Sequence, residues 1–329
     1  MTKARGAGRP RAVLAKASRK ANAEARKALG SLASLRVSPR TATHYTKALE
    51  VFFNWMRAED IALPQEPDEF DMVICLFIED CWQEGEGRGR AADVVCGIQW
   101  KSPLLKRQLN GSWALLKAWQ RTELPARAPP MPLRVMFALA EWFLRQRRTG
   151  MALGVVLAMH CFLRTGELLS LAFGQLSWAE DCRSAIVSLG ITKGGARRGA
   201  AESVTLELDW LVLALRAWAL SEPGCLVVNE THHRFRQLFS EGLAAIRCDE
   251  WGFAPYSLRR GGATELWRRT GALGRVTLRG RWAQPATARI YINDGLAILA
   301  EMRLPAEPVG ELSRAFCKRF GCAYALFVK

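Results

Sequence analysis

The chain has 329 residues, half of them hydrophobic and 24% charged, a balance that excludes a disordered protein and leaves room for two folded domains. Its longest apolar run, residues 151–163, is shorter than the about 20 residues of a membrane-spanning helix, so we expect no membrane partner. Lys and Arg number 47 against 31 Asp and Glu, which gives a formal net charge of +16. This surplus favours an anionic partner, nucleic acid above all, although a solvated basic surface has the same composition.

Much of the positive charge lies in a basic arm, residues 1–36, which is rich in Ala, Gly, Ser and Arg. We predict that this arm is disordered, because it contains a single acid, Glu24, and no apolar core. Within it, Gly8-Arg9-Pro10-Arg11 resembles the core of an AT-hook, which binds the minor groove of DNA. A basic, acid-poor start is also typical of an organelle transit peptide or a nuclear localisation patch.

Apolar residues at helical spacing predict an all-helical domain over residues 37–122. Ser38 is suited to cap its first helix, with Pro39 in the first turn. The expected helices cover residues 41–58, 69–83, 91–100 and 103–121. Four prolines between residues 124 and 132 then predict an interdomain linker, which we place at residues 123–132.

The remaining residues, 133–329, are predicted to form a mixed α+β domain that ends in a C-terminal helix. Two short β-like runs, residues 184–191 and 203–208, flank a loop rich in Gly and Arg. The helical patterns cover residues 133–145, 151–163, 210–220, 232–246, 257–269, 287–299 and 311–326. The fold class predicted for the whole chain is therefore mainly α with a small β-sheet.

The nine cysteines include no Cys-x-x-Cys pair and follow no signal peptide, so we expect reduced thiols inside a cell. The adjacent His232 and His233 have no acid or cysteine to complete a set of metal ligands. Glycine-rich nucleotide motifs and the Gly-x-Ser-x-Gly motif are absent as well. We therefore expect neither a metal site nor a cofactor.

Seven polar and aromatic residues of the second half form the candidate site. Each has an ordinary structural explanation when taken alone, as a helix-terminal ion pair, a solvated hairpin lysine or a core aromatic residue. Their spacing along the chain sets them apart, because Tyr256 and Arg259 share one helix face and Trp282 lies nine residues before Tyr291. In chain order they are Arg164, Glu167, Lys193, Tyr256, Arg259, Trp282 and Tyr291.

In this order, these residues make the chain resemble the tyrosine recombinase (phage integrase) family over residues 38–329. The resemblance implies a helical core-binding domain and a mixed catalytic domain, which enclose duplex DNA as a C-shaped clamp. It also implies that the protein cleaves and rejoins double-stranded DNA through a covalent 3′-phosphotyrosyl intermediate. The implied assembly is a homo-oligomer, a tetramer on paired DNA sites, located on DNA inside the cell (in the nucleus if the host is eukaryotic, otherwise in the cytoplasm or nucleoid).

The resemblance assigns a role to each site residue. It makes Tyr291 the nucleophile and Trp282 the residue at a position that is His or Trp in the family. The resemblance makes Arg164 and Arg259 the two catalytic arginines and Glu167 the acid that supports the geometry of Arg164. Lys193 matches the β-hairpin lysine. Forked guanidinium donors suit the charge that develops on a phosphoryl transition state, and a loop lysine can protonate the leaving hydroxyl.

The chain departs from the family pattern at Tyr256, because the family usually has histidine three residues before the second arginine. One hypothesis is an active enzyme of site-specific recombination or mobile-element integration, and another is a degenerate recombinase that binds DNA without cutting it. An unrelated basic helical protein would leave the spacings unexplained. A type IB topoisomerase shares the chemistry, but the short chain and the helical first domain favour recombination.

The apolar stripe of the predicted C-terminal helix, residues 311–326, allows two interpretations. It could dock on the catalytic domain of a neighbouring copy, as the resemblance implies, or pack on its own domain.

Overall fold

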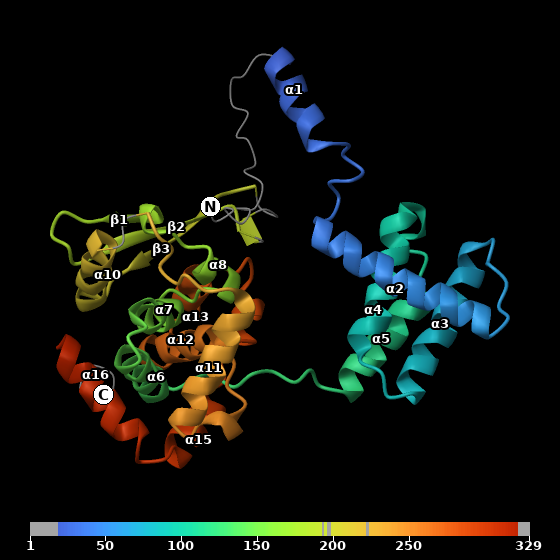
Figure 1. Ribbon diagram of the computed structural model, residues 1–329. Coiled ribbons are helices and arrows are strands. Elements are labelled where there is room, and N and C mark those ends of the chain that lie inside the picture. The colour runs from blue at the N-terminus through green and yellow to red at the C-terminus, as the bar shows by residue number, and fades with distance from the viewer. Residues whose placement is uncertain (1–18, 193, 196–198, 222–223, 322–329) are drawn as a thin grey trace. The chain divides into compact units, whose positions relative to one another are not determined.

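The computed structural model describes residues 19–192, 194–195, 199–221 and 224–321, and Figure 1 shows its helices and strands. The chain divides into two compact units, one before and one after the boundary between Ala126 and Arg127. Among the described residues, no helix has the length and apolar character needed to cross a membrane. The structure confirms the predicted fold class, since helices dominate and one three-stranded sheet is present.

The first unit contains helices only. Its core is built from the apolar faces of four helices and includes Phe52, Ile74, Phe77, Val94 and Leu116. The cap predicted for the second helix is present, because the Ser38 side chain accepts a hydrogen bond from the Thr41 backbone nitrogen at 3.2 Å. The helices are α1 (Arg19–Leu29), α2 (Pro39–Ala58), α3 (Pro67–Gln83), α4 (Arg88–Lys101) and α5 (Asn110–Thr122), with a 3₁₀ turn η1 (Pro103–Leu105).

The helix expected over residues 103–121 is interrupted, because a contact from another helix starts α5 at residue 110. The Asp71 carboxylate of α3 accepts hydrogen bonds from the backbone nitrogens of Gly111 and Ser112 at 2.7 and 2.9 Å. It thereby satisfies two of the donors that a helix N-terminus leaves free. Periodicity along the chain does not reveal a cap that comes from 40 residues away.

Helix α1 lies within the arm that was predicted to be disordered, so the structure differs from the prediction at residues 19–29. Its sequence is rich in Ala, Arg and Lys, which all have high helix propensity. No residue of α1 is buried, which leaves its basic side chains in solvent. The AT-hook-like residues 8–11 lie outside the described part of the chain.

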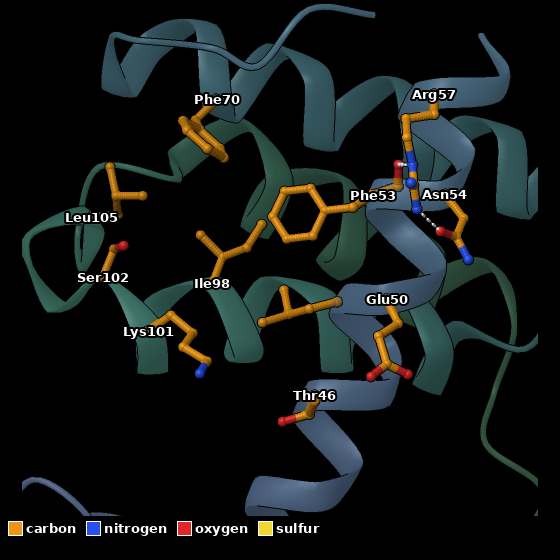
Figure 2. A pocket seen from close by; sticks show the side chains of 11 residues that line it. Thr46, Glu50, Phe53, Asn54, Arg57, Phe70, Ile98, Lys101, Ser102 and Leu105 are labelled. Atoms are coloured by element: carbon orange, nitrogen blue, oxygen red, sulfur yellow. Dashed lines mark hydrogen bonds between the residues drawn. The ribbon is translucent and has the colours of Figure 1, made fainter.

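A groove of about 450 Å³ opens on the first unit along α2 and α4 (Figure 2). Figure 2 shows the Phe53 ring pointing toward Ile98 and Phe70 inside it. Polar side chains stand along the same groove, among them Glu50, and Arg57, which donates a hydrogen bond to the Asn54 side chain. The unit therefore has an apolar surface that the helical periodicity did not single out.

The chain enters the second unit through an irregular segment, residues 123–132, which contains no helix or strand. Its end is fixed, because the Met131 backbone nitrogen donates to the Ser257 carbonyl at 3.1 Å and the Met131 side chain is buried. The helices that follow are α6 (Leu133–Arg145), α7 (Thr149–His160), α8 (Thr165–Leu169), α10 (Asp209–Ser221), α11 (His232–Ala245), α12 (Pro255–Thr270), α13 (Leu273–Arg279), α14 (Pro285–Arg289), α15 (Asp294–Arg303) and α16 (Val309–Phe320).

The sheet is antiparallel, with the order β1 (Leu176–Trp178), β2 (Ala185–Gly190) and β3 (Glu202–Leu206). Strand β1 was not predicted, because three residues are too few to show an alternating pattern. Strand β3 begins one residue before the predicted start, and its buried side chains alternate as Glu202, Val204 and Leu206. An acidic side chain thus shares the core face of this strand with two aliphatic residues.

The helix expected over residues 287–299 is two helices, and Tyr291 lies in the connection between them. The hydroxyl of Thr264 in α12 fixes this break. It accepts a hydrogen bond from the Asn293 backbone nitrogen at 3.2 Å and donates to the Tyr291 carbonyl at 3.4 Å. The Asn293 side chain then caps α15 by accepting from the Leu296 backbone nitrogen at 3.1 Å. Tyr291 is therefore held by a tertiary contact and not by a continuous amphipathic helix.

Helix α16 packs on its own unit. Phe316 is fully buried and stacks on Phe137 of α6 with ring centroids 5.3 Å apart, while Leu312 and Cys317 are also buried. Arg319 adds an ion pair with the buried Glu141 at 2.9 Å. Of the two interpretations of the C-terminal helix, the structure favours packing in cis. The end of the predicted helix, residues 322–326, lies outside the described residues.

This packing makes α16 part of the core and predicts the effect of shortening its central side chain. Phe316→Ala should lower the free energy of unfolding by about 3–5 kcal/mol, as is typical when a buried Phe is truncated. Met302→Ala in α15 is a suitable control, because Met302 is exposed and should change stability little. Chemical denaturation of the two variants measures the difference. An equal, small loss in both would contradict cis packing of α16.

Candidate active site

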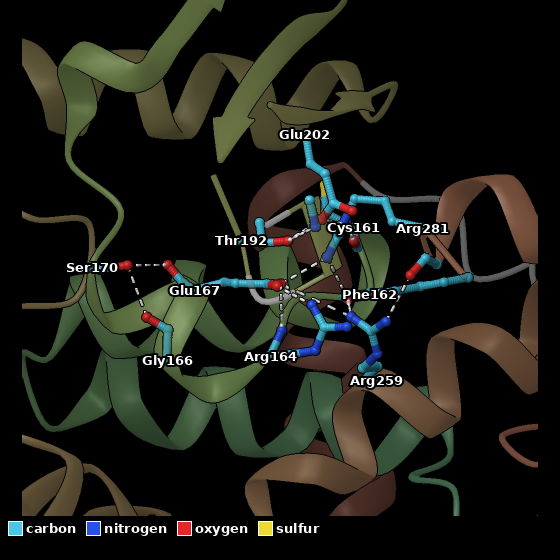
Figure 3. A network of polar contacts seen from close by, with 12 residues as sticks. Cys161, Phe162, Arg164, Gly166, Glu167, Ser170, Thr192, Glu202, Arg259 and Arg281 are labelled. Atoms are coloured by element: carbon cyan, nitrogen blue, oxygen red, sulfur yellow. Dashed lines mark hydrogen bonds and ion pairs between the residues drawn. The ribbon is translucent and has the colours of Figure 1, made fainter. Parts of the chain in front are cut away.

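The site begins where α7 ends, at a backbone turn that has a positive φ. Phe162 has φ of 50°, a left-handed conformation uncommon for residues other than glycine. The turn directs the Phe162 carbonyl at two guanidinium groups, those of Arg259 and Arg281, with the Arg281 contact at 3.3 Å. It also places Arg164 in extended backbone as the residue that precedes α8. Three arginine side chains therefore meet near the C-terminal end of α7 (Figure 3).

Glu167 is the centre of this cluster. Its carboxylate accepts a hydrogen bond from the backbone nitrogen of Arg164 at 2.9 Å and contacts the Arg164 guanidinium. The same carboxylate lies 2.7 Å from Nη2 of Arg281 and 3.9 Å from Nη1 of Arg259. Figure 3 shows Glu167 reaching toward all three arginines. The residue predicted to support one arginine therefore orients three.

Arg259 is fully buried and held by backbone carbonyls. Its Nη1 donates to the Phe162 carbonyl, and its Nη2 donates to the Gly280 carbonyl at 2.7 Å. Burial, with the nearby positive charges of Arg164 and Arg281, lowers the pKa of Arg259 to about 10. The group remains charged at neutral pH. Its guanidinium carbon lies 4.9 Å from the centre of the Trp282 ring and 5.4 Å from that of Tyr291.

The two glycines that follow Arg260 explain how Arg259 reaches this depth. A Cβ atom at Gly262 would lie 2.0 Å from the Met159 carbonyl oxygen of α7, and one at Gly261 would lie 2.2 Å from the Met131 carbonyl oxygen. Only glycine allows so close an approach of backbone to backbone. The Arg-Arg-Gly-Gly run therefore lets α12 pack directly against α7 and the end of the linker segment.

Arg281 belongs to the site, although sequence reasoning missed it. Its side chain is 5% exposed and pairs with Glu167 and, through Nε at 3.4 Å, with the Glu202 carboxylate. Glu202 also accepts a hydrogen bond from the Thr192 hydroxyl. One signal for this pair existed in the sequence, because a strand that begins at Glu202 places an acid on the core face. Such an acid requires a buried cation.

Tyr256 and Tyr291 meet at their hydroxyl groups. Tyr256, which is 41% exposed, donates a hydrogen bond to the Tyr291 oxygen. The Tyr291 ring also packs on Trp282, with centroids 4.4 Å apart. Tyr256, Trp282 and Tyr291 thus form one aromatic cluster next to Arg259, although Tyr256 and Tyr291 lie 35 positions apart in the sequence.

The contact between the tyrosines shifts their pKa values in opposite directions. Burial works to raise the pKa of Tyr291, but the hydrogen bond from Tyr256, the charge of Arg259, the hydrogen bond from Trp282 and the charge of Arg164 outweigh it and lower that pKa below its ordinary value. Burial and the hydrogen bond to Tyr291 raise the pKa of Tyr256. Of this pair, Tyr291 is the one that ionises first, and Tyr256 remains the neutral donor.

The cluster is arranged to hold an anion. Three guanidinium groups face two carboxylates, those of Glu167 and Glu202, so the buried part of the site keeps a positive excess. Within the described residues, the buried Nε of Arg259 has no hydrogen-bond partner. A buried donor of this kind is normally satisfied, and an anion beside it would satisfy it. A phosphodiester group has the charge and the acceptor oxygens for this role.

The structure brings six of the seven predicted site residues into one cluster, namely Arg164, Glu167, Tyr256, Arg259, Trp282 and Tyr291. The seventh, Lys193, lies outside the described residues. Its sequence neighbour Thr192 is buried and lines a cavity of about 310 Å³ together with Arg164 and Glu167. No group of three or more potential metal ligands occurs in the part of the chain that the structure describes.

Solved structures of tyrosine recombinases and integrases have this fold. A XerH site-specific recombinase bound to palindromic difH substrate matches with a TM-score of 0.56 at 13% identity, over 79% of this chain and 78% of that chain. The Tn1549 transposon integrase in complex with transposon right end DNA matches with a TM-score of 0.53 at 12% identity, over 85% of this chain and 96% of that chain. A lambda integrase dimer bound to a COC′ core site matches with a TM-score of 0.51 at 12% identity, over 84% of this chain and 78% of that chain.

Sequence comparison adds nothing to this result, since no protein-family model and no curated protein matches the chain. The likeness is therefore one of fold. It confirms the predicted resemblance at the level of architecture, and the three structures share 12–13% sequence identity with this chain.

The opposite pKa shifts predict which tyrosine ionises first. In an alkaline titration followed by tyrosinate absorbance, the lowest-pH step should disappear in Tyr291→Phe. Tyr45→Phe is the matched control, because burial raises the pKa of Tyr45 and this variant should keep the step. Tyr256→Phe removes a donor that stabilises the phenolate, so the step should move to higher pH. A Tyr324→Phe background removes the tyrosine that lies outside the described residues. An unchanged lowest step in Tyr291→Phe would contradict the lowered pKa.

Proposed function

We propose that this chain cleaves and rejoins double-stranded DNA as a tyrosine recombinase, in site-specific recombination or in the integration of a mobile element. The observation that carries the proposal is the position of the Tyr291 hydroxyl. It lies in a buried cluster with excess positive charge, near the unpaired Nε donor of Arg259, and accepts a hydrogen bond that favours its ionised form. A nucleophile and an anion-binding site are thus adjacent.

In the proposed reaction, the Tyr291 oxygen attacks the phosphorus of a DNA phosphodiester. A bond between the Tyr291 oxygen and phosphorus forms, and the bond from phosphorus to the 5′ oxygen breaks. The product is a 3′-phosphotyrosyl link and a free 5′ hydroxyl. Tyr291 loses its proton to solvent, and the leaving 5′ oxygen gains one from a general acid. Reversal of the same steps rejoins DNA, with the phenolate as leaving group.

Arg164 and Arg259 bind the non-bridging oxygens in this proposal. Arg164 is partly exposed, and its guanidinium reaches the site from the entrance of α8, whereas Arg259 is fixed from below by two carbonyls. Their planar forks can each make paired hydrogen bonds to one phosphate. Trp282 contributes its Nε1 donor, and Glu167 keeps both arginines in place.

Lys193 is the proposed general acid, by its place between β2 and β3 and by the resemblance of the chain to recombinases. An ammonium group in this loop carries the proton that the 5′ oxygen needs.

The lambda integrase structures that match this fold are a dimer and a tetramer, the latter bound to a Holliday junction. We propose the same kind of assembly here, a homo-oligomer that acts as a tetramer on paired sites of duplex DNA inside the cell. In this proposal residues 37–122 form the DNA-binding domain, residues 123–132 the linker and residues 133–329 the catalytic domain.

Trapping of the covalent intermediate tests the proposal. A nicked suicide substrate lets the cleaved fragment escape, so the wild type should accumulate a protein–DNA adduct that is stable to denaturation. Tyr291→Phe should bind DNA with unchanged affinity and form no adduct. Tyr45→Phe, in the first unit, is the matched control and should form a normal amount. Adduct formation by Tyr291→Phe would refute the assignment of the nucleophile.

A second candidate is a degenerate recombinase that binds DNA without cutting, and the hydrogen bond between Tyr256 and Tyr291 is the observation that favours it. This bond occupies the nucleophile with a neutral donor that cannot serve as a base near pH 7, because its own pKa is raised. The two candidates differ in the behaviour of Tyr256 variants.

For an active enzyme, Tyr256→Phe should raise the activation free energy of cleavage by about 1.5–3 kcal/mol, the range for a hydrogen bond to a charged group. Tyr256→His should retain or raise the rate, because histidine also donates and can share a proton near neutral pH. The measurement is the rate of adduct formation on the suicide substrate. If the wild type forms no adduct and Tyr256→His does, the degenerate binder is the correct description.

A further inference from the structure

We propose that Thr192, Glu202 and Arg281 form a positioning chain that fixes the β2–β3 loop against the arginine cluster and thereby places the general acid at the leaving group. The inference rests on the proposed function. It concerns three residues that the spacing of the recombinase motif does not include. Figure 3 shows Thr192, Glu202 and Arg281 above Glu167, and Arg259 below it.

Arg281 acts inward and does not reach a substrate. Its Nη1 donates to the Cys161 carbonyl at 3.1 Å, and its Nη2 donates to the Phe162 carbonyl at 3.3 Å and the Glu167 carboxylate at 2.7 Å. Its Nε lies 3.4 Å from the Glu202 carboxylate. With these partners and a side chain that is 5% exposed, the donors of this guanidinium are directed to protein groups and not to solvent. Its contribution is to hold other groups.

The backbone of Arg281 supports this interpretation. Its φ of 57° lies in the left-handed region, as does that of Phe162, whose carbonyl it contacts. A non-glycine residue remains in this conformation only where its surroundings fix it, and here the side-chain contacts do so. The segment that leads from α13 to Trp282 is therefore fastened to the end of α7 and to Glu167.

Glu202 transmits this attachment to the sheet. It is the first residue of β3, is buried on the core face and pairs across the sheet with Gly190, next to a register shift at Ser188 and Gly190. Its carboxylate joins Arg281 to the Thr192 hydroxyl. Thr192 in turn accepts a hydrogen bond from the Gly195 backbone nitrogen at 3.1 Å. Both ends of the loop that contains Lys193 are thus connected to one buried guanidinium.

This connection has a chemical consequence that is specific to one step. Arg164 and Arg259 should keep their contacts to Glu167 and to carbonyls when Thr192 or Glu202 is changed, because neither residue takes part in those contacts. Phosphate binding and nucleophilic attack should then persist. Protonation of the leaving oxygen should fail, because that step depends on where the loop lies. A purely structural role for the pair would slow every step alike.

The experiment compares adduct formation on two suicide substrates, one with the normal 5′ oxygen and one with a 5′ bridging sulfur, which leaves without a proton. Thr192→Val removes the hydroxyl with little change of volume, and Glu202→Gln removes the charge and keeps the shape. Both should slow cleavage of the oxygen substrate about 10- to 100-fold, because a misplacement of about 1 Å costs up to ~100-fold. Both should cleave the sulfur substrate at the wild-type rate, as should Lys193→Ala.

Arg319→Met is the matched control, because Arg319 also pairs with a buried carboxylate, Glu141, but joins α16 to α6. It should affect both substrates equally or not at all. Equal slowing of both substrates in Thr192→Val and Glu202→Gln, or no slowing in either, would overturn the positioning chain. Thermal melts confirm that each variant is folded.

Amide hydrogen exchange tests the proposal even if the wild type forms no adduct on either substrate, the result that would refute the proposed function. Exchange of residues 190–202 should rise in Thr192→Val and in Glu202→Gln, and remain at the wild-type level in Arg319→Met. If exchange in this segment stays unchanged in both loop variants, Thr192 and Glu202 do not hold the loop and the inference is wrong.

Discussion

The buried carboxylate of Glu167 is the constraint on which the candidate site depends. Three guanidinium groups, from α12, from the start of α8 and from the segment after α13, approach it within 4 Å. In a medium of low dielectric constant these like charges would repel each other strongly without an acid between them. Glu167 therefore ties three distant segments together. Because it and Glu202 offset only part of the charge, the same arrangement leaves positive potential beside Tyr291.

Motif spacing singled out six residues that the structure brings together. It missed Arg281, which belongs to the site because of ion pairs with residues distant in the sequence. Six of the residues singled out in the sequence meet in one cluster, although only Glu167 of α8 and Tyr256 and Arg259 of α12 lie within helices. The other three, Arg164, Trp282 and Tyr291, lie in turns and connections, where helical periodicity gives no guide. Arg281 follows a glycine in a short connection and shows no period. Its partner Glu202 lies at the boundary of a strand, where a shift of one residue changes the face to which every side chain is assigned.

The helices that were predicted as continuous and are broken share one physical cause. In each case a side chain from another helix satisfies the backbone donors of a new helix start, Asp71 for α5 and Thr264 for the turn before α15. The sequence around the break contains only the backbone donors, because the acceptor side chain comes from a distant segment. The apolar period continues across the break and gives no sign of it. The second break is the consequential one, because it places Tyr291 in a turn whose carbonyl and neighbouring nitrogen are both held by Thr264 of the Arg259 helix. The proposed nucleophile and Arg259 are therefore positioned by the same element.

Tyr256 changes the logic of the site more than a simple loss of histidine would. Its hydroxyl donates to the Tyr291 oxygen, so the hydrogen bond stabilises the phenolate before attack and raises the pKa of Tyr256 itself. In the proposed reaction the Tyr291 oxygen loses its negative charge as it bonds to phosphorus, and the hydrogen bond weakens at that moment. The Tyr256 donor then becomes available to a non-bridging oxygen, where charge is developing. A neutral donor can thus serve first the nucleophile and then the phosphate. It supplies no proton in either role, so the proposed reaction needs a separate general acid for the leaving oxygen, the role proposed for Lys193.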